Sequence, residues 1–174
     1  MGPIEDEVLL TIESAVGRTL EVRVDRLGAV EVPAYAFDGH RRQYSSELIL
    51  RSLVRRAPDD VFRILAVTDV DLFIPMLTFV FGQAQLKGTA SVVSTARLCQ
   101  EFYGLPQSRE LMLKRIAKES IHELGHTFGL THCEDQSCLM SVAVSINQID
   151  AKGEELCDDC SLLLNHLFPK YQKT

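Results

Sequence analysis

The chain has 174 residues, of which 46% are hydrophobic and 24% are charged, with ten glycines and six prolines. This composition predicts a single folded domain over residues 1–174 and excludes a mostly disordered, collagen-like or repetitive chain. The formal net charge of −6 argues against binding nucleic acid or an anionic membrane through the whole surface. The longest uncharged stretch, residues 72–86, is too short for the roughly 20 apolar residues that span a bilayer.

Two features of the sequence indicate where the protein is located: the start of the chain and its cysteines. Met1–Glu7 is acidic where a secretory signal would be basic, so we expect a cytoplasmic protein. Five cysteines are present, and four of them fall between residues 133 and 160. Because a cytoplasmic chain keeps its thiols reduced, a metal site with one free thiol is favoured over a disulfide framework.

Hydrophobic patterning predicts a mixture of strands and helices. In chain order we expect strands over 8–12 and 29–32, a helix over 46–56, and strands over 61–67, 78–81 and 90–94. Five arginines between residues 41 and 56 form a basic group that we interpret as a solvated face. The clearest helix spans 108–128, because apolar residues recur at intervals of three and four. They are Leu113, Ile116, Ala117, Ile121, Leu124 and Phe128.

Two histidines, His122 and His126, lie on the side of this helix opposite its apolar stripe. Side chains four residues apart project from consecutive turns of one face, so both imidazoles can approach one metal ion. Gly129 can take the positive φ that ends a helix, after which the chain turns back and returns His132 towards the first two histidines. Three neutral imidazoles bind zinc and leave the fourth position to water, as in a catalytic site. Glu123, beside a ligand, is the predicted general base.

Four cysteines follow the last histidine with spacings typical of a metal site. A C-x4-C pair is followed by a C-x2-C pair, formed by Cys133, Cys138, Cys157 and Cys160. Four thiolates close a tetrahedral zinc site with no open position, so this zinc would be structural and would tie the segment after the helix to a C-terminal helix. Free or disulfide-bonded cysteines are the alternative. The sequence therefore predicts two zinc ions per chain, one catalytic and one structural.

Met140 follows Cys138 by two residues, and a lone methionine usually fills core space. In this order, however, the histidines, the cysteines and Met140 resemble the archaemetzincin family of zinc metalloproteases, with a signature that covers residues 119–160. Residues 42–46 and 68–72 are also similar to segments of that family. The resemblance implies a metzincin-like α/β (α+β) fold with a twisted mixed sheet, an active-site helix and a zinc-stabilised C-terminal helical segment. It also implies that Met140 forms a tight turn beneath the catalytic metal.

The predicted function is zinc-dependent hydrolysis of peptide bonds by a monomer, with the peptide or protein substrate extended beside a sheet edge around residues 78–94. Neither nucleic acid nor a membrane is expected as a partner. One alternative is a catalytically silent, zinc-stabilised binding module. Another is a three-histidine zinc endoribonuclease, a class that shares the H-x3-H-x5-H spacing but usually lacks the glutamate found here as Glu123. No tyrosine closely follows Met140, so an oxyanion-stabilising residue stays unassigned.

Overall fold

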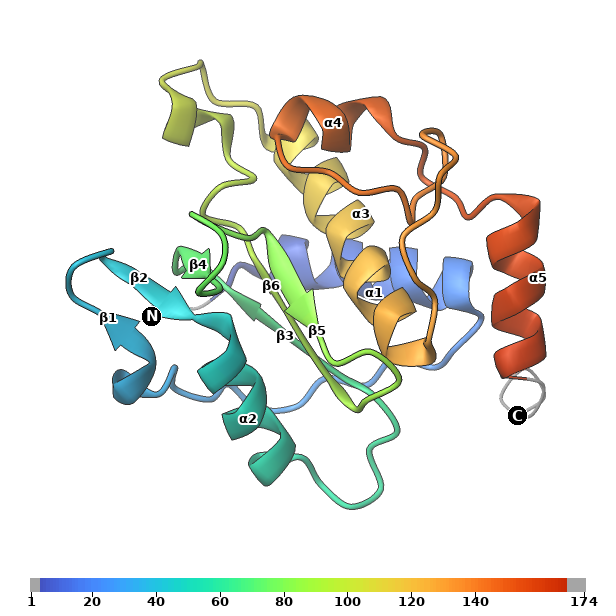
Figure 1. Ribbon diagram of the computed structural model, residues 1–174, viewed down its shortest axis with the longest axis horizontal. Helices are drawn as coiled ribbons and strands as arrows, with labels where there is room; N and C mark the ends of the chain where they lie inside the picture. The colour runs from blue at the N-terminus through green and yellow to red at the C-terminus, as the bar shows by residue number, and fades with distance from the viewer. Residues whose placement is uncertain (1–3, 169–174) are drawn as a thin grey trace.

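The computed structural model describes residues 4–168, which fold into helices around two small mixed sheets (Figure 1). The first three residues of the acidic start lie outside the described residues. The α-helices are α1 (Asp6–Leu20), α2 (Ser46–Arg56), α3 (Arg109–Phe128), α4 (Ile146–Ala151) and α5 (Asp158–Leu167), and short 3-10 helices cover Ala34–Ala36 and Gln100–Tyr103. The strands are β1 (Phe37–Asp38), β2 (Gln43–Ser45), β3 (Ile64–Thr68), β4 (Leu72–Phe73), β5 (Gly82–Ala84) and β6 (Ala90–Ser94). The predicted α+β class is confirmed.

The strands form two three-stranded sheets where a single sheet was expected. One has the order β3-β6-β5, with β3 parallel and β5 antiparallel to β6. The other has the order β1-β2-β4, with β1 antiparallel and β4 parallel to β2. An isolated antiparallel bridge between Leu72 and Val80 leads from β4 towards β5. Because β5 is an outer strand, one of its edges has no strand partner among the described residues.

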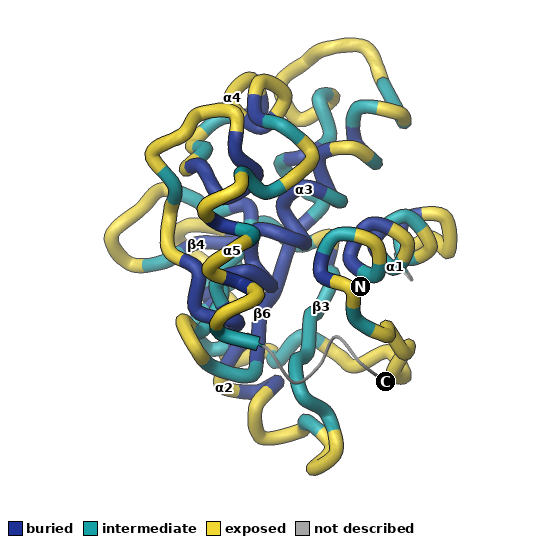
Figure 2. Tube along the Cα trace, turned by 90° about the vertical axis from the view of Figure 1, so that its right-hand side faces the viewer, coloured by how far each residue is buried: buried dark blue, intermediate teal, exposed yellow. Residues whose placement is uncertain are grey.

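The central strand β6 is buried along its whole length, and its residues face two separate parts of the core. Val93 belongs to the cluster that includes α1 and α3, whereas Val92 and Ala90 belong to the cluster around α2. This alternation follows from the period of two of a β-strand. Helices therefore cover both faces of the β3-β6-β5 sheet (Figures 1 and 2). Both β5 and α3 contact β6, and they also contact each other.

Four of the predicted strands are wrong or shifted. Residues 8–12 belong to α1, where Val8, Ile12 and Val16 are buried at helical spacing; a five-residue apolar run cannot distinguish the two periods. Residues 29–32 form no strand, and Val30 is exposed without a strand partner. The strand predicted over 78–81 begins only at Gly82, and the one over 61–67 begins at Ile64. The strand over 90–94 and the two helices are confirmed, and the five arginines are exposed as expected.

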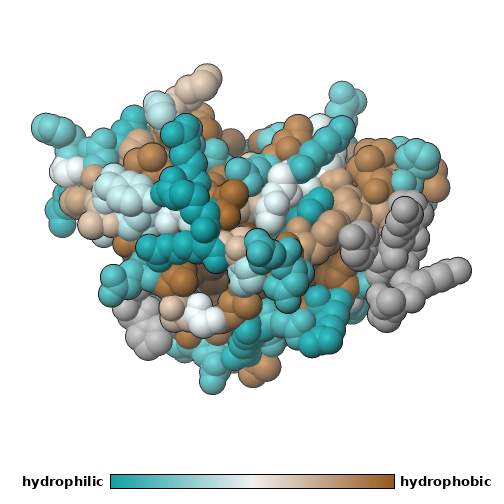
Figure 3. Space-filling view, turned by 90° about the horizontal axis from the view of Figure 1, so that it is seen from below, coloured by the Kyte–Doolittle hydropathy of each residue, from teal (hydrophilic) through white to brown (hydrophobic). Residues whose placement is uncertain are grey.

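α3 lies at the centre of the molecule and is buried on most of its surface (Figure 2). No helix among residues 4–168 is long and apolar enough to cross a bilayer. The face seen from below mixes hydrophilic and hydrophobic residues (Figure 3).

Candidate metal centres

The C-terminal half of α3 and the turn after it bring three histidines together. The helix ends at Gly129, which has a φ of +105° and whose N–H bonds to the carbonyls of Gly125 and His126. The left-handed conformation is the one that glycine adopts readily, and it reverses the chain as predicted. His132 thereby returns to His122 and His126, and one ring nitrogen of each imidazole lies within 4.8 Å of the others.

The spacing of these nitrogens fits a shared metal ion. His122 Nε2 and His126 Nε2 are 3.2 Å apart. Two zinc–nitrogen bonds of 2.0–2.1 Å at a tetrahedral angle separate the nitrogens by about 3.3 Å. The ring centroids of His132 lie 5.3 Å from those of His122 and 4.9 Å from those of His126. His122 is buried, whereas His132 is exposed, so the cluster opens towards solvent on the His132 side.

The opposite ring nitrogens fix the tautomers of the two helical histidines. His122 Nδ1 lies 3.1 Å from the carbonyl oxygen of Leu139, and His126 Nδ1 lies 2.8 Å from that of Leu130. Because a carbonyl only accepts, each Nδ1 carries the proton, and each Nε2 of the neutral ring presents a lone pair. Burial lowers the pKa of His122 well below its usual range, helped by the charge of Lys152, and burial also lowers the pKa of His126. Both rings are therefore held in the neutral, metal-binding form.

Glu123 is buried beside these histidines, with 6% of its surface exposed. Its side chain lies against the first residue of β5, since a β-carbon built on Gly82 would be 2.7 Å from Glu123 Cγ. Burial raises the pKa of Glu123 well above its usual range; the carboxylate of Glu119 adds to this effect and the ammonium of Lys152 opposes it. A carboxyl group with a raised pKa can accept a proton and keep it, which is the property of a general base that later acts as an acid.

The four predicted cysteines also converge. Their sulfurs lie within 4.8 Å of one another, and all four are free thiols in the structure. Cys133 Sγ and Cys157 Sγ are 3.7 Å apart, which agrees with the roughly 3.8 Å that two tetrahedral zinc–sulfur bonds impose. The N–H of Met140 and that of Cys157 point at Cys138 Sγ, at 3.4 and 3.3 Å. The donor set and its spacing fit zinc.

The segment after α3 serves both clusters. His132 and Cys133 are adjacent, and Leu139, whose carbonyl faces His122, directly follows Cys138. Met140 is fully buried and packs against α3, because a β-carbon on Gly125 would be only 2.6 Å from Met140 Sδ. Residues 132–140 therefore contribute to both clusters, so a shift of this segment would change the geometry of both.

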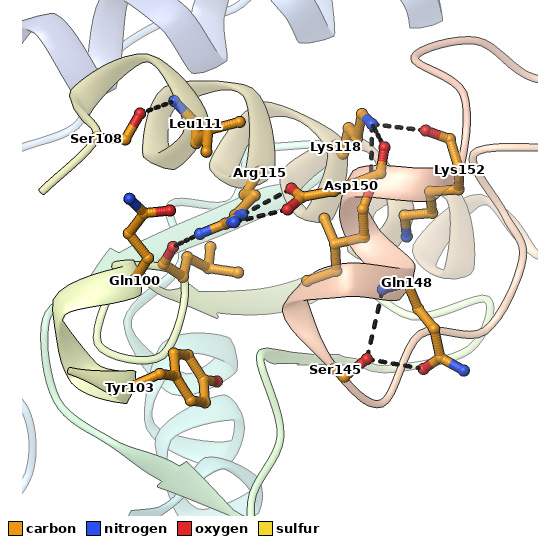
Figure 4. Close-up of polar contacts among 12 residues, drawn as sticks. Gln100, Tyr103, Ser108, Leu111, Arg115, Lys118, Ser145, Gln148, Asp150 and Lys152 are labelled. Atoms are coloured by element: carbon orange, nitrogen blue, oxygen red, sulfur yellow. Dashed lines mark hydrogen bonds and ion pairs between the residues drawn. The ribbon is translucent and has the colours of Figure 1, made fainter. Parts of the chain in front are cut away.

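The sequence reasoning missed a set of buried charges on the histidine side of α3. Arg115 pairs with Asp150 at 2.6 Å, and Lys118 donates to carbonyls at the end of α4 (Figure 4). Lys152 Nζ lies 2.7 Å from Glu119 Oε1. The sequence did contain one sign of this set, since Arg115, Glu119 and His122 follow one another at intervals of three and four and so share a face of the helix. Their partners lie at residues 149–152, so the spacing alone could not identify them.

Known proteins resemble this chain over nearly its whole length. A model of peptidase family M54 matches residues 6–166. The archaemetzincin of Methanocaldococcus jannaschii is 39% identical over 160 residues, which cover 92% of this chain and 87% of the relative. The crystal structure of the archaemetzincin from Methanopyrus kandleri has a TM-score of 0.88 and 36% identity, covering 98% of this chain and 92% of that chain. The structure of a zinc-dependent peptidase from Methanocorpusculum labreanum has a TM-score of 0.83 and 31% identity, covering 91% and 93%.

Proposed function

The chain belongs to peptidase family M54, the archaemetzincins, and is a zinc metallopeptidase; we propose that His122, His126 and His132 hold its catalytic zinc and that Glu123 is its general base. The observation that carries this assignment is the pair of Nε2 atoms 3.2 Å apart, each on a ring whose Nδ1 faces a backbone carbonyl, next to a buried carboxyl group. Two lone pairs at this distance repel each other unless a cation lies between them.

A bound zinc supplies Lewis-acid chemistry, since it polarises a carbonyl and acidifies an attacking water. The chain's own residues do the rest. Glu123 takes a proton from the water and passes it to the leaving amine, and the raised pKa of Glu123 favours the protonated intermediate state. The carbonyls of Leu139 and Leu130 orient the imidazoles of His122 and His126 throughout.

A second zinc, held by Cys133, Cys138, Cys157 and Cys160, is proposed to be structural. Four thiolates leave no open coordination position, and the cluster joins the segment after α3 to the start of α5. Two zinc ions per chain follow. Thiols that remain reduced suit the cytoplasm, which is the compartment we propose.

The substrate is a peptide or protein, as befits a peptidase family. We propose that the substrate binds in extended form along the unpaired edge of β5, through main-chain hydrogen bonds. We also propose that the protein acts as a single-domain monomer. The endoribonuclease alternative loses its support, because the family matched over residues 6–166 is a peptidase family. The other alternative, a zinc-stabilised binding module without catalytic activity, is tested directly by measuring peptide turnover.

The test is Glu123→Ala, compared with the wild type and with Glu110→Ala on the exposed first turn of α3. Zinc per chain is measured by elemental analysis, and turnover of a peptide library and of RNA is followed by mass spectrometry. Both variants are expected to keep two zinc ions, and only Glu123→Ala should lose a factor of about 10² to 10⁴ in peptide turnover. Full turnover by Glu123→Ala would exclude the mechanism. A wild type that binds zinc but cleaves no peptide would favour the binding module.

A further inference from the structure

We infer that Gly82 is a positioning residue for Glu123: the absence of a side chain at position 82 creates the space in which the Glu123 carboxyl group lies. This inference rests on the proposed role of Glu123. A β-carbon on Gly82 would be 2.7 Å from Glu123 Cγ and 2.9 Å from Glu123 Oε1. Optimal contacts between such atoms are about 3.5–4.0 Å, so no residue other than glycine fits at position 82 without movement of Glu123.

The backbone on neither side of this contact can easily retreat. On the side of β5, Gly82 is in register with Val93 of the buried strand β6, and the N–H of Ser94 bonds to the carbonyl of Phe81 at 2.8 Å. On the side of α3, residues 118–125 are all buried, so the helix has no free space to move into. The contact involves Glu123 Cγ, near the root of the side chain, so a rotation of the terminal carboxylate alone would not relieve it.

Gly82 lies both on the proposed substrate-binding edge and in contact with the proposed general base. β5 is the edge along which we propose that the substrate lies, and Glu123 rests on the same residue of that edge. Gly82 therefore sets the separation between the substrate backbone and the base. A displacement of a reacting group by about 1 Å can reduce the rate by about 10²-fold. We expect an alanine at position 82 to lower kcat while substrate affinity and zinc content are largely kept.

A second clash has to be separated from the first. The same β-carbon would be 2.8 Å from the carbonyl oxygen of Val92, so Gly82→Ala also strains the pairing of β5 with β6. A thermodynamic cycle with Gly82→Ala, Glu123→Ala and the double variant separates the two effects, because Glu123→Ala removes only the contact with Glu123. Gly39→Ala is the matched control, since a β-carbon there meets no atom within 4 Å.

Melting temperature and zinc content are measured for every variant of the cycle, and kcat and KM are measured for Gly82→Ala. If the inference is right, Gly82→Ala keeps two zinc ions, loses 10- to 100-fold in kcat with KM nearly unchanged, and lowers the melting temperature less in the Glu123→Ala background than in the wild type. Folding of Gly82→Ala only in the Glu123→Ala background would also support it.

Three results would overturn the inference: an unchanged kcat, a change confined to KM, or an equal loss of melting temperature in both backgrounds. Failure to fold in both backgrounds would do the same, because strain in the strands would then dominate. The failure of the general-base proposal is distinguishable, since it would appear as full turnover in Glu123→Ala alone, whatever the melting temperatures show.

Discussion

Lys118 Nζ lies 2.6 Å from the backbone carbonyl oxygen of Lys152, and it also donates to the carbonyl of Ile149 at 3.0 Å (Figure 4). The ammonium of one helix thus satisfies carbonyls at and just beyond the end of another, α4, which would otherwise be buried without partners. This contact fixes the C-terminal end of α4 against α3.

Lys118→Met should therefore destabilise the protein. Methionine keeps an apolar stem of similar length but leaves the carbonyls unpaired, and each buried unsatisfied group costs about 1–3 kcal/mol. The free energy of unfolding is measured by urea denaturation, and hydrogen exchange should increase over residues 146–152. Lys114→Met is the control, because Lys114 makes an exposed pair with Glu110 on the same helix. An equally small effect of both substitutions would show that Lys118 does not hold α4.

The ion pair between Glu119 and Lys152 is almost fully buried, with side-chain exposures of 5% and 1%. Lys152→Met leaves the Glu119 carboxylate without its cation and should cost about 3–5 kcal/mol in the free energy of unfolding. Combining it with Glu119→Leu removes both charges and should recover most of that loss. Urea denaturation of the two single variants and the double variant checks this. Additive losses would mean that the two side chains do not stabilise each other.

The cysteine cluster should contribute to folding through its metal. Cys157→Ser should reduce the zinc content from two ions to one and lower the melting temperature, because the site does not exist in the unfolded chain and its binding energy supports the fold. Cys99→Ser is the matched control, since Cys99 is half-buried and lies outside the cluster. Two zinc ions and an unchanged melting temperature in Cys157→Ser would refute the assignment.

The sequence predicted which histidines come together better than it predicted the strands of the sheet. The histidines at positions 122 and 126 share a face because of helix geometry alone, and Gly129 marks the turn that returns His132 to them. These relationships are local, so spacing determines them. The strand expected over residues 8–12 failed for the converse reason, since a short apolar run fits either period and only its packing against α3 makes it part of α1.

The buried charges of α3 show where sequence reasoning ends. The side of the helix opposite its apolar stripe would ordinarily face water, yet Arg115, Lys118 and Glu119 are buried there. Burial is possible because partners 31 to 35 residues further along the chain neutralise or hydrogen-bond each of them. Pairing at that separation depends on the tertiary fold. The contact between Gly82 and Glu123 could not be predicted from the sequence either, because it forms between a strand and a helix that are far apart in the chain.

Met140 allows the packing role of the turn to be separated from a role in binding metal. The side chain is fully buried against Gly125, and its backbone carbonyl accepts from the N–H of Cys133 at 3.0 Å. Met140→Leu keeps the backbone contact and nearly the same volume, so it should cost less than about 1.5 kcal/mol. Because the proposed ligands are all imidazoles and thiolates, zinc content should stay at two ions per chain and the general-base chemistry should continue.

Met140→Ala provides the contrast, since it removes the side chain from the same place and should cost about 2–5 kcal/mol through the cavity that it leaves. Urea denaturation and elemental analysis are carried out on both variants. A graded loss of stability with constant zinc content is the signature of packing. Loss of the histidine-site zinc from Met140→Leu at an unchanged free energy of unfolding would instead show that the thioether acts on the metal, because a branched hydrocarbon of the same size replaces its packing and lacks only its sulfur.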